Sequence, residues 1–228
     1  FEGVPATSSE KEEMARLARE AMEQGAFGLS SGLIYPPGMY SDTDELIAIC
    51  KPLKDFGGVY TSHIRGTGET LLSATKEIIK IGEQNDIGVV HSHLAAFGEE
   101  HWPKIDHVLG LHEDARARGV DITFDVIPYI AANSTLLAIF PPWSVEGGVG
   151  KLIERLKNEN VRRRISVDVE ETVPGWPPWL PGAWPENLAR ATGWENIIIT
   201  SVGSATNQHL EGKNLAELGE EEERAPFD

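Results

Sequence analysis

Two histidines lie near the carboxyl ends of two short apolar segments, at residues 59–65 and 89–94. Each segment, with His63 in the first and His93 in the second, is typical of a buried strand, and the helical pattern between them predicts parallel strands. Imidazole is a common zinc ligand, and a catalytic zinc keeps one position open for water. The pair favours a mononuclear or dinuclear metal hydrolase, with two hydrogen-bonded structural histidines as the alternative.

Alternation along a strand places further polar side chains on the same face. His91 shares a face with His93, so it is either the ligand in place of His93 or a group that orients it. Arg65, two residues after His63, has the planar guanidinium that can hold a substrate carboxylate in bidentate fashion. An ion pair between Arg65 and a nearby glutamate is the alternative.

Other candidates lie on and after the last predicted strand. Tyr129 could donate a hydrogen bond to a developing oxyanion, or its ring could pack inside a barrel. Ser134 and Thr135 follow and are candidates for contact with a substrate. Asp125, on the strand itself, is expected to have a structural role as a hydrogen-bond acceptor or a helix cap.

The spacing of apolar residues predicts strands that alternate with helices. Ser9 with Glu12, and Asp42 with Glu45, form capping patterns at the first two helices. Pro52 removes a backbone donor and should kink the second helix. The alternation is typical of an α/β fold with a parallel sheet and right-handed crossovers. We expect strands at residues 25–30, 59–64, 89–94 and 120–127, and helices at 9–24, 42–56, 71–82 and 103–118.

The regular alternation ends after residue 129. A proline-rich stretch at residues 173–185 cannot continue a helix or a central strand. Its tryptophans, Trp176, Trp179 and Trp184, could form an apolar lid or simply pack there. We also predict a short helix at 149–158, a strand at 196–201 and an amphipathic helix at 214–223. The chain thus divides into a strand-and-helix segment at 1–129, an insertion or lid at 130–205 and the start of a further helix at 206–228.

Composition excludes several classes of protein. The 228 residues carry a formal net charge of −16, which disfavours binding to nucleic-acid phosphates. No apolar run could span a membrane and no export leader is visible, so we expect a cytoplasmic protein with a small-molecule partner. Cys50, the single cysteine, lies on an apolar stripe and is expected to be buried. Of the remaining histidines, His112 is expected to pack, and His101, His107 and His209 to lie on the surface or in loops.

Six segments follow one another in an order found in one enzyme family. They are residues 25–38, 62–65, 92–94, 125–129, 141–143 and 210–215. In this order they resemble the N-acyl-D-amino-acid deacylases, or D-aminoacylases, of the amidohydrolase superfamily. The resemblance implies a zinc-dependent hydrolase that cleaves the N-acyl bond of N-acyl-D-amino acids. It also implies a portion of a (β/α)8 TIM-type barrel, about strands 4 to 7, with an insertion after the seventh strand.

The resemblance also implies site residues. His63 and His93 match the zinc ligands on the fifth and sixth barrel strands. The positions near the substrate are matched by Tyr35, Arg65, Tyr129 and Ser134. The family's His-x-His pair, its bridging cysteine or glutamate and its aspartate general base are not matched in this sequence. We therefore expect no catalytic residue in this chain and poor activity of the chain alone. The family commonly has a lysine two residues after the second histidine, where this chain has Ala95.

Two other functions stay open at this point. One is a cyclic amidohydrolase that resembles hydantoinases or dihydroorotases, which belong to the same superfamily. The other is a non-catalytic barrel fragment that serves as a binding or structural module, which Ala95 and the unmatched ligands favour. Neither the oligomeric state nor the number of metal ions follows from the sequence.

Overall fold

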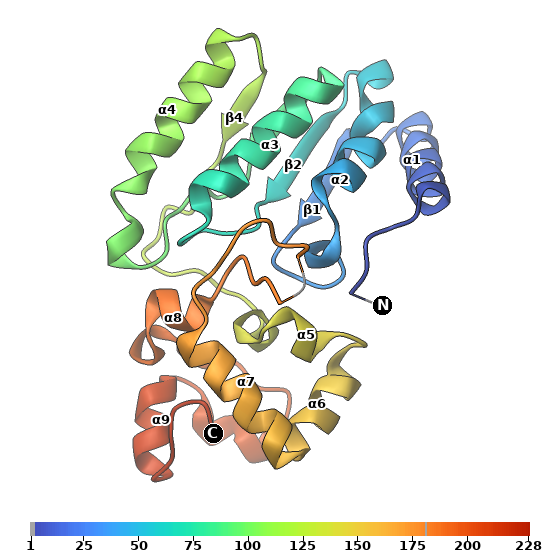
Figure 1. The fold of residues 1–228 in the computed structure, drawn as a ribbon. Coiled ribbons are helices and arrows are strands. Elements are labelled where there is room, and N and C mark those ends of the chain that lie inside the picture. Colours follow the sequence, from blue (N-terminus) through green and yellow to red (C-terminus); the bar gives the residue numbers. More distant parts are fainter. Residues whose placement is uncertain (1–2, 181) are drawn as a thin grey trace.

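The computed structural model describes residues 3–180 and 182–228 and has an α/β architecture built on a parallel sheet (Figure 1). Four strands pair in the order of the sequence, and every pair is parallel. The strands are β1 (Gly28–Gly32), β2 (Val59–His63), β3 (Gly88–His91) and β4 (Ile122–Phe124). The predicted α/β class with a parallel sheet is confirmed.

Four helices cover one face of this sheet (Figure 1). They are α1 (Ser8–Glu23), α2 (Thr43–Cys50), α3 (Leu71–Asn85) and α4 (Lys104–Ala117). Three short 3-10 helices accompany them: η1 (Gly38–Tyr40), η2 (Lys51–Phe56) and η3 (Glu99–His101). Each crossover between neighbouring strands contains a helix, because parallel strands can be joined only by a long connection.

Capping side chains fix where the first helices begin. The capping box of α1 is formed by Thr7 and Glu10, two residues before the predicted pair. Asp42 caps α2 as predicted and accepts a hydrogen bond of 2.6 Å from the Glu45 N–H. Pro52 does not kink a long helix, because α2 ends at Cys50 and the proline enters the first turn of η2, where no backbone donor is needed.

The two faces of the sheet differ in burial. On β2, Tyr60 and Ser62 are fully buried under the helices, whereas Val59 on the opposite face is 39% exposed. Cys50, on the helix side, is also fully buried as predicted, and burial raises the pKa of its thiol to about 12. The face that carries Val59 and His63 is therefore the one that the helices leave uncovered.

A second lobe lies beyond the carboxyl ends of the strands (Figure 1). It has its own apolar cluster, which includes Ile165, Val169 and Trp184. The lobe consists of η4 (Leu136–Ile139), α5 (Pro142–Val145), α6 (Val149–Lys157), α7 (Glu159–Glu171), α8 (Leu188–Thr192), η5 (Trp194–Asn196), η6 (Ala205–Leu210) and α9 (Leu215–Glu221).

None of the described helices, in either part of the molecule, is long and apolar enough to cross a lipid bilayer.

Helix α7 was not predicted. Its segment is rich in charged residues, and only Ile165 and Val169, four positions apart, are buried. The side chain of Asn158 caps the helix by accepting hydrogen bonds from the N–H groups of Asn160 and Val161. That cap and the single narrow apolar stripe were the signals available in the sequence.

The strand predicted at residues 196–201 is wrong. Ile197, Ile198 and Ile199 form only a short antiparallel contact with the turn before α9. Ile199 N–H donates to Lys213 at 2.9 Å, and Leu215 N–H donates to Ile197 at 3.0 Å. Ile197 packs against the apolar cluster of the second lobe, whereas Ile198 is 55% exposed, so the segment has no place in the sheet.

Candidate functional site

His63 and His93 meet at the carboxyl end of the sheet. His63 is the last residue of β2, and His93 lies two residues beyond β3. The Nδ1 atom of His63 and the Nε2 atom of His93 are 3.1 Å apart, and the ring centroids are 4.5 Å apart. The structure thus brings together the two imidazoles that the strand pattern placed at one end of the sheet.

The position of His93 depends on a sharp turn after β3. His93 has a φ of 40°, in the left-handed region that few residues other than glycine adopt. Its N–H donates to the carboxylate of Asp125, and the Leu94 N–H donates to the Asp125 carbonyl at 2.8 Å. Asp125 thereby fixes the turn that aims His93 at His63, which agrees with the structural role expected for it.

Burial keeps His63 uncharged. Its pKa is lowered to about 4, first because burial penalises the charged ring and second because His93 is close. Its Nε2 atom is buried without a hydrogen-bond partner. Neutral imidazole is the form that ligates zinc, so an unpartnered nitrogen here fits a metal ligand. Among residues 3–180 and 182–228, no third histidine, cysteine or carboxylate joins this pair in a candidate metal cluster.

Tyr35 and Ser134 lie next to the histidine pair. The Tyr35 ring centroid is 5.6 Å from that of His63, and the Tyr35 hydroxyl lies 2.8 Å from the Ser134 hydroxyl. Ser134 also lines a cavity of about 490 Å³, together with Phe97, Thr135 and residues 196–201. A hydroxyl pair from two separate loops therefore links the ring beside His63 to the wall of this cavity.

Arg65 does not point into this site. Its side chain is completely buried, and its Nε donates to Glu77 at 2.7 Å. Its Nη2 donates to Ser41 at 3.1 Å, and the guanidinium lies 5.8 Å from the Trp179 ring centre. The structure therefore shows the local ion pair that was the alternative to a carboxylate-binding role.

Tyr129 is also apart from the pair. It is 79% exposed, on the segment that follows β4. Neither interior packing nor a contact with the histidines is seen for this residue. Ala95, at the position where the family commonly has lysine, lies in the loop after β3 and offers no charged group.

His91 belongs to the opposite face of the sheet. It is the last residue of β3 and is buried, and its Nδ1 atom lies 3.3 Å from Nε2 of His112 on α4. Burial, followed by the nearby charge of His112, lowers the pKa of His91 to about 3. The turn at His93 breaks the two-residue alternation, so the idea that His91 shares a face with His93 is wrong. The prediction that His112 packs in the interior is confirmed.

One buried carboxylate near the strand ends was not anticipated. Glu186, in the second lobe, accepts hydrogen bonds from the N–H and the hydroxyl of Thr67 in the loop after β2. Burial raises the pKa of its carboxyl to about 7. The two residues are far apart in sequence, and nothing in the local pattern around Glu186 pointed to this contact.

Comparison with known proteins gives relatives of one kind. No protein-family model matches the chain. The chain is 40% identical over 131 residues to a D-aminoacylase of Alcaligenes xylosoxydans xylosoxydans. The aligned residues are 58% of this chain and 27% of that protein. It is 36% identical over 138 residues to an N-acyl-D-aspartate deacylase of the same organism, again 27% of that protein. The chain thus spans about a quarter of the length of these curated relatives.

Solved structures agree with the sequence relatives. The chain superimposes on a D-aminoacylase crystal structure that is described as defining a novel subset of amidohydrolases. The TM-score is 0.64 and the sequence identity is 26%, and the superposition covers 99% of this chain and 36% of that one. An N-acyl-D-glutamate deacylase of Bordetella bronchiseptica, solved with zinc and a phosphonate inhibitor, has the same fold, with a TM-score of 0.69 and 20% identity over 98% of this chain and 36% of that one.

These similarities point first to a class, the amidohydrolases, in which the D-aminoacylase structure is placed. Within that class, the chain is similar to the N-acyl-D-amino-acid deacylases, and the resemblance predicted from its motifs is confirmed. The chain covers about a third of each solved chain.

Proposed function

We propose that this chain is the central part of a metal-dependent hydrolase that cleaves the N-acyl bond of N-acyl-D-amino acids. The observation that carries the proposal is the convergence of His63 and His93, with ring nitrogens 3.1 Å apart at the carboxyl end of a parallel sheet. Active sites of (β/α)8 enzymes lie at that end. The sequence relatives named as deacylases supply the reaction and the substrate class.

We further propose that β1 to β4 are about strands 4 to 7 of a (β/α)8 barrel. Their sequential parallel order with a helix in each crossover supports this. The apolar side chains on and beyond β4 are well exposed, as expected if further strands pack there: Phe124, Val126, Ile127 and Ile130. In this proposal residues 130–205 are the insertion that covers the pocket.

The metal in this proposal is zinc, held by His63 and His93 and by ligands from other parts of the enzyme. When bound, zinc lowers the pKa of a water molecule and polarises the acyl carbonyl. His63 suits this role because burial keeps it neutral and leaves Nε2 unpartnered. The resemblance assigns the general base to an aspartate that this sequence does not match.

The substrate would lie between the histidine pair and the cavity that Ser134 lines. Tyr35, fixed through its hydroxyl by Ser134, can donate a hydrogen bond to a substrate oxygen. Tyr129 is a further candidate because it is exposed near the same strand ends. Arg65 would bind the substrate carboxylate only if it released Glu77, so we propose that it supports the site through the loop that it anchors.

The test is an assay of the full-length protein with N-acetyl-D-amino acids, their L enantiomers and hydantoins. We expect hydrolysis of the D substrates, loss of activity on chelation and recovery with Zn²⁺. Preference for hydantoins would favour a cyclic amidohydrolase instead, and inactivity on every substrate with zinc bound would support a non-catalytic module.

A further inference from the structure

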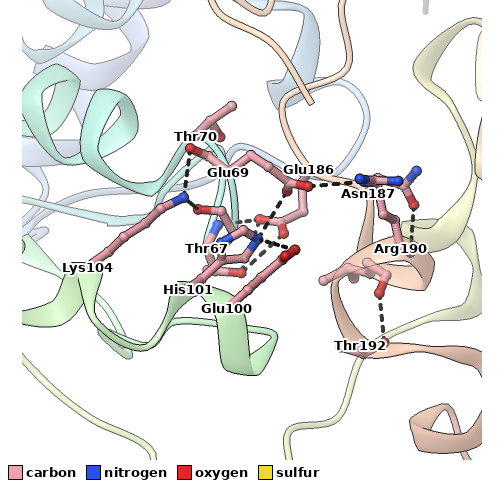
Figure 2. Close-up of polar contacts among 12 residues, drawn as sticks. Thr67, Glu69, Thr70, Glu100, His101, Lys104, Glu186, Asn187, Arg190 and Thr192 are labelled. Atoms are coloured by element: carbon pink, nitrogen blue, oxygen red, sulfur yellow. Dashed lines mark hydrogen bonds and ion pairs between the residues drawn. The ribbon is translucent and has the colours of Figure 1, made fainter. Parts of the chain in front are cut away.

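A second group of metal-binding side chains lies away from the histidine pair. Glu69 is in the loop between β2 and α3, and Glu100 and His101 lie in η3 (Glu99–His101), after β3. One ligand atom from each of the three lies within 4.8 Å of the other two. Figure 2 shows the two carboxylates and the imidazole turned toward one another. We call these three residues the Glu69–His101 cluster.

The imidazole of His101 is buried without a hydrogen bond. Its side chain is only 6% exposed, although the sequence predicted a surface or loop position, and its Nε2 atom has no hydrogen-bond partner. The Oε2 atom of Glu69 is also buried and also has no hydrogen-bond partner. Buried polar atoms are nearly always paired, so two unpartnered atoms that face each other indicate a missing bridging atom.

The distances within the cluster fit a bridging cation. His101 Nε2 is 3.5 Å from Glu69 Oε2 and 3.4 Å from Glu100 Oε1, both longer than an ordinary N–H···O hydrogen bond. Ligands at about 2.1 Å from a tetrahedral zinc ion are separated by about 3.4 Å. The two separations therefore match ligands around an ion better than direct hydrogen bonds.

The surrounding contacts hold the cluster in place. Arg190 of α8 pairs with the other oxygen of Glu69, Oε1, at 3.3 Å. Lys104 does not pair with a carboxylate here, because its ammonium donates to the carbonyl oxygens of Gly68 and Glu69. Neither cation therefore contacts Oε2 of Glu69, which faces His101. The side chain of Glu100 is 66% exposed, which leaves the cluster open to solvent on that side.

We propose that Glu69, Glu100 and His101 bind a divalent transition-metal cation of the zinc class. One nitrogen and two carboxylate oxygens are a donor set that zinc accepts, and water from the exposed side completes the coordination. The ion ties the loop after β2 to η3 and, through Arg190, to the second lobe. The proposal shares no residue with the His63–His93 pair and does not depend on the deacylase function.

The test measures Zn²⁺ binding by equilibrium dialysis on the full chain, in a His93→Asn background that removes the histidine pair. Asparagine is chosen because it tolerates the positive φ at this position. We expect about one Zn²⁺ per chain, at least tenfold weaker binding in Glu100→Gln and no more than a twofold change in Glu99→Gln. Glu99 is an exposed neighbour on η3 with the same charge, so it is a matched control.

A second measurement identifies the nitrogen ligand without a change to the buried ring. In spectra of chain with ¹⁵N-labelled histidine, Zn²⁺ should shift one imidazole nitrogen, and the shift should be lost in Glu100→Gln. A background chain that binds no Zn²⁺, equal weakening by the two glutamine variants, or binding without a histidine shift would each overturn the proposal. Because His93 is replaced throughout, none of these results bears on the deacylase proposal.

Discussion

Two histidine pairs lie on opposite faces of the same sheet. The ring nitrogens are 3.1 Å apart in the His63–His93 pair and 3.3 Å apart in the His91–His112 pair. Each pair contains one buried nitrogen without a partner, Nε2 of His63 and Nδ1 of His112. Two imidazoles in contact are therefore not enough to identify a functional site.

The difference between the pairs is their surroundings. His91 and His112 are enclosed between β3 and α4, with the Phe124 ring 5.6 Å from His112. His63 and His93 lie at the strand ends, beside the Tyr35–Ser134 hydroxyl pair and a cavity. Only the second arrangement gives a substrate access, so we expect one pair to affect activity and the other to affect stability.

The largest effect is expected when the His63–His93 pair is broken. His63→Ala should lower the deacylase activity of the full-length protein at least a thousandfold, since loss of a metal ligand removes several kcal/mol of transition-state stabilisation. The measurement is kcat/KM on an N-acetyl-D-amino acid. His107→Ala, an exposed histidine on α4, is the control and should keep full activity. Retained activity in His63→Ala would remove the distinction between the pairs.

Breaking the His91–His112 pair should lower the stability of the protein. His112→Ala leaves a cavity and deprives His91 of its partner, so we expect the free energy of unfolding to fall by about 2–3 kcal/mol. Urea denaturation measures it. Glu113→Ala, at the exposed next position of α4, should change stability by less than about 0.5 kcal/mol. Equal effects from the two variants would show that the packed pair is energetically unimportant.

A smaller effect should follow from loosening the turn at His93. Asp125→Ala removes the acceptor of the His93 N–H, which we expect to cost about 1 kcal/mol of stability and to weaken Zn²⁺ binding by roughly tenfold. Asp125→Asn keeps an acceptor and should lie close to the wild type. Calorimetric titration with Zn²⁺ decides the matter, and unchanged affinity in Asp125→Ala would mean that the turn does not position the ligand.

The last effect concerns pH. Burial lowers the pKa of His112 below its usual value near 6.5, so the unfolded chain binds a proton before the folded one. Stability is then complete above about pH 6.5 and falls as the pH decreases, by at most about 1.4 kcal/mol per pH unit for one histidine. His112→Leu should show a shallower decrease in urea titrations between pH 6.5 and 5. An unchanged slope would contradict the buried, neutral state.

The sequence was most informative where a pattern is local. The capping residue Asp42, the parallel alternation of strands and helices and the burial of Cys50 all depend on neighbouring residues or on a simple period, and all are confirmed. His101 was expected at the surface or in a loop; it lies in the connection between β3 and α4 but is buried, because of its contact with the loop at Glu69. The strand at 196–201 was wrong because this segment pairs only with the turn before α9 and packs one isoleucine, Ile197, against the second lobe.

The sequence by itself determined that His63 and His93 stand at the same end of parallel strands, because strand direction and crossover length follow from local periodicity. It did not determine which side chains face each other. Arg65 pairs with Glu77, and His91 turns toward α4, because these contacts join elements whose packing depends on the whole core. Only the tertiary structure, in which desolvation and the available partners act together, decided these contacts.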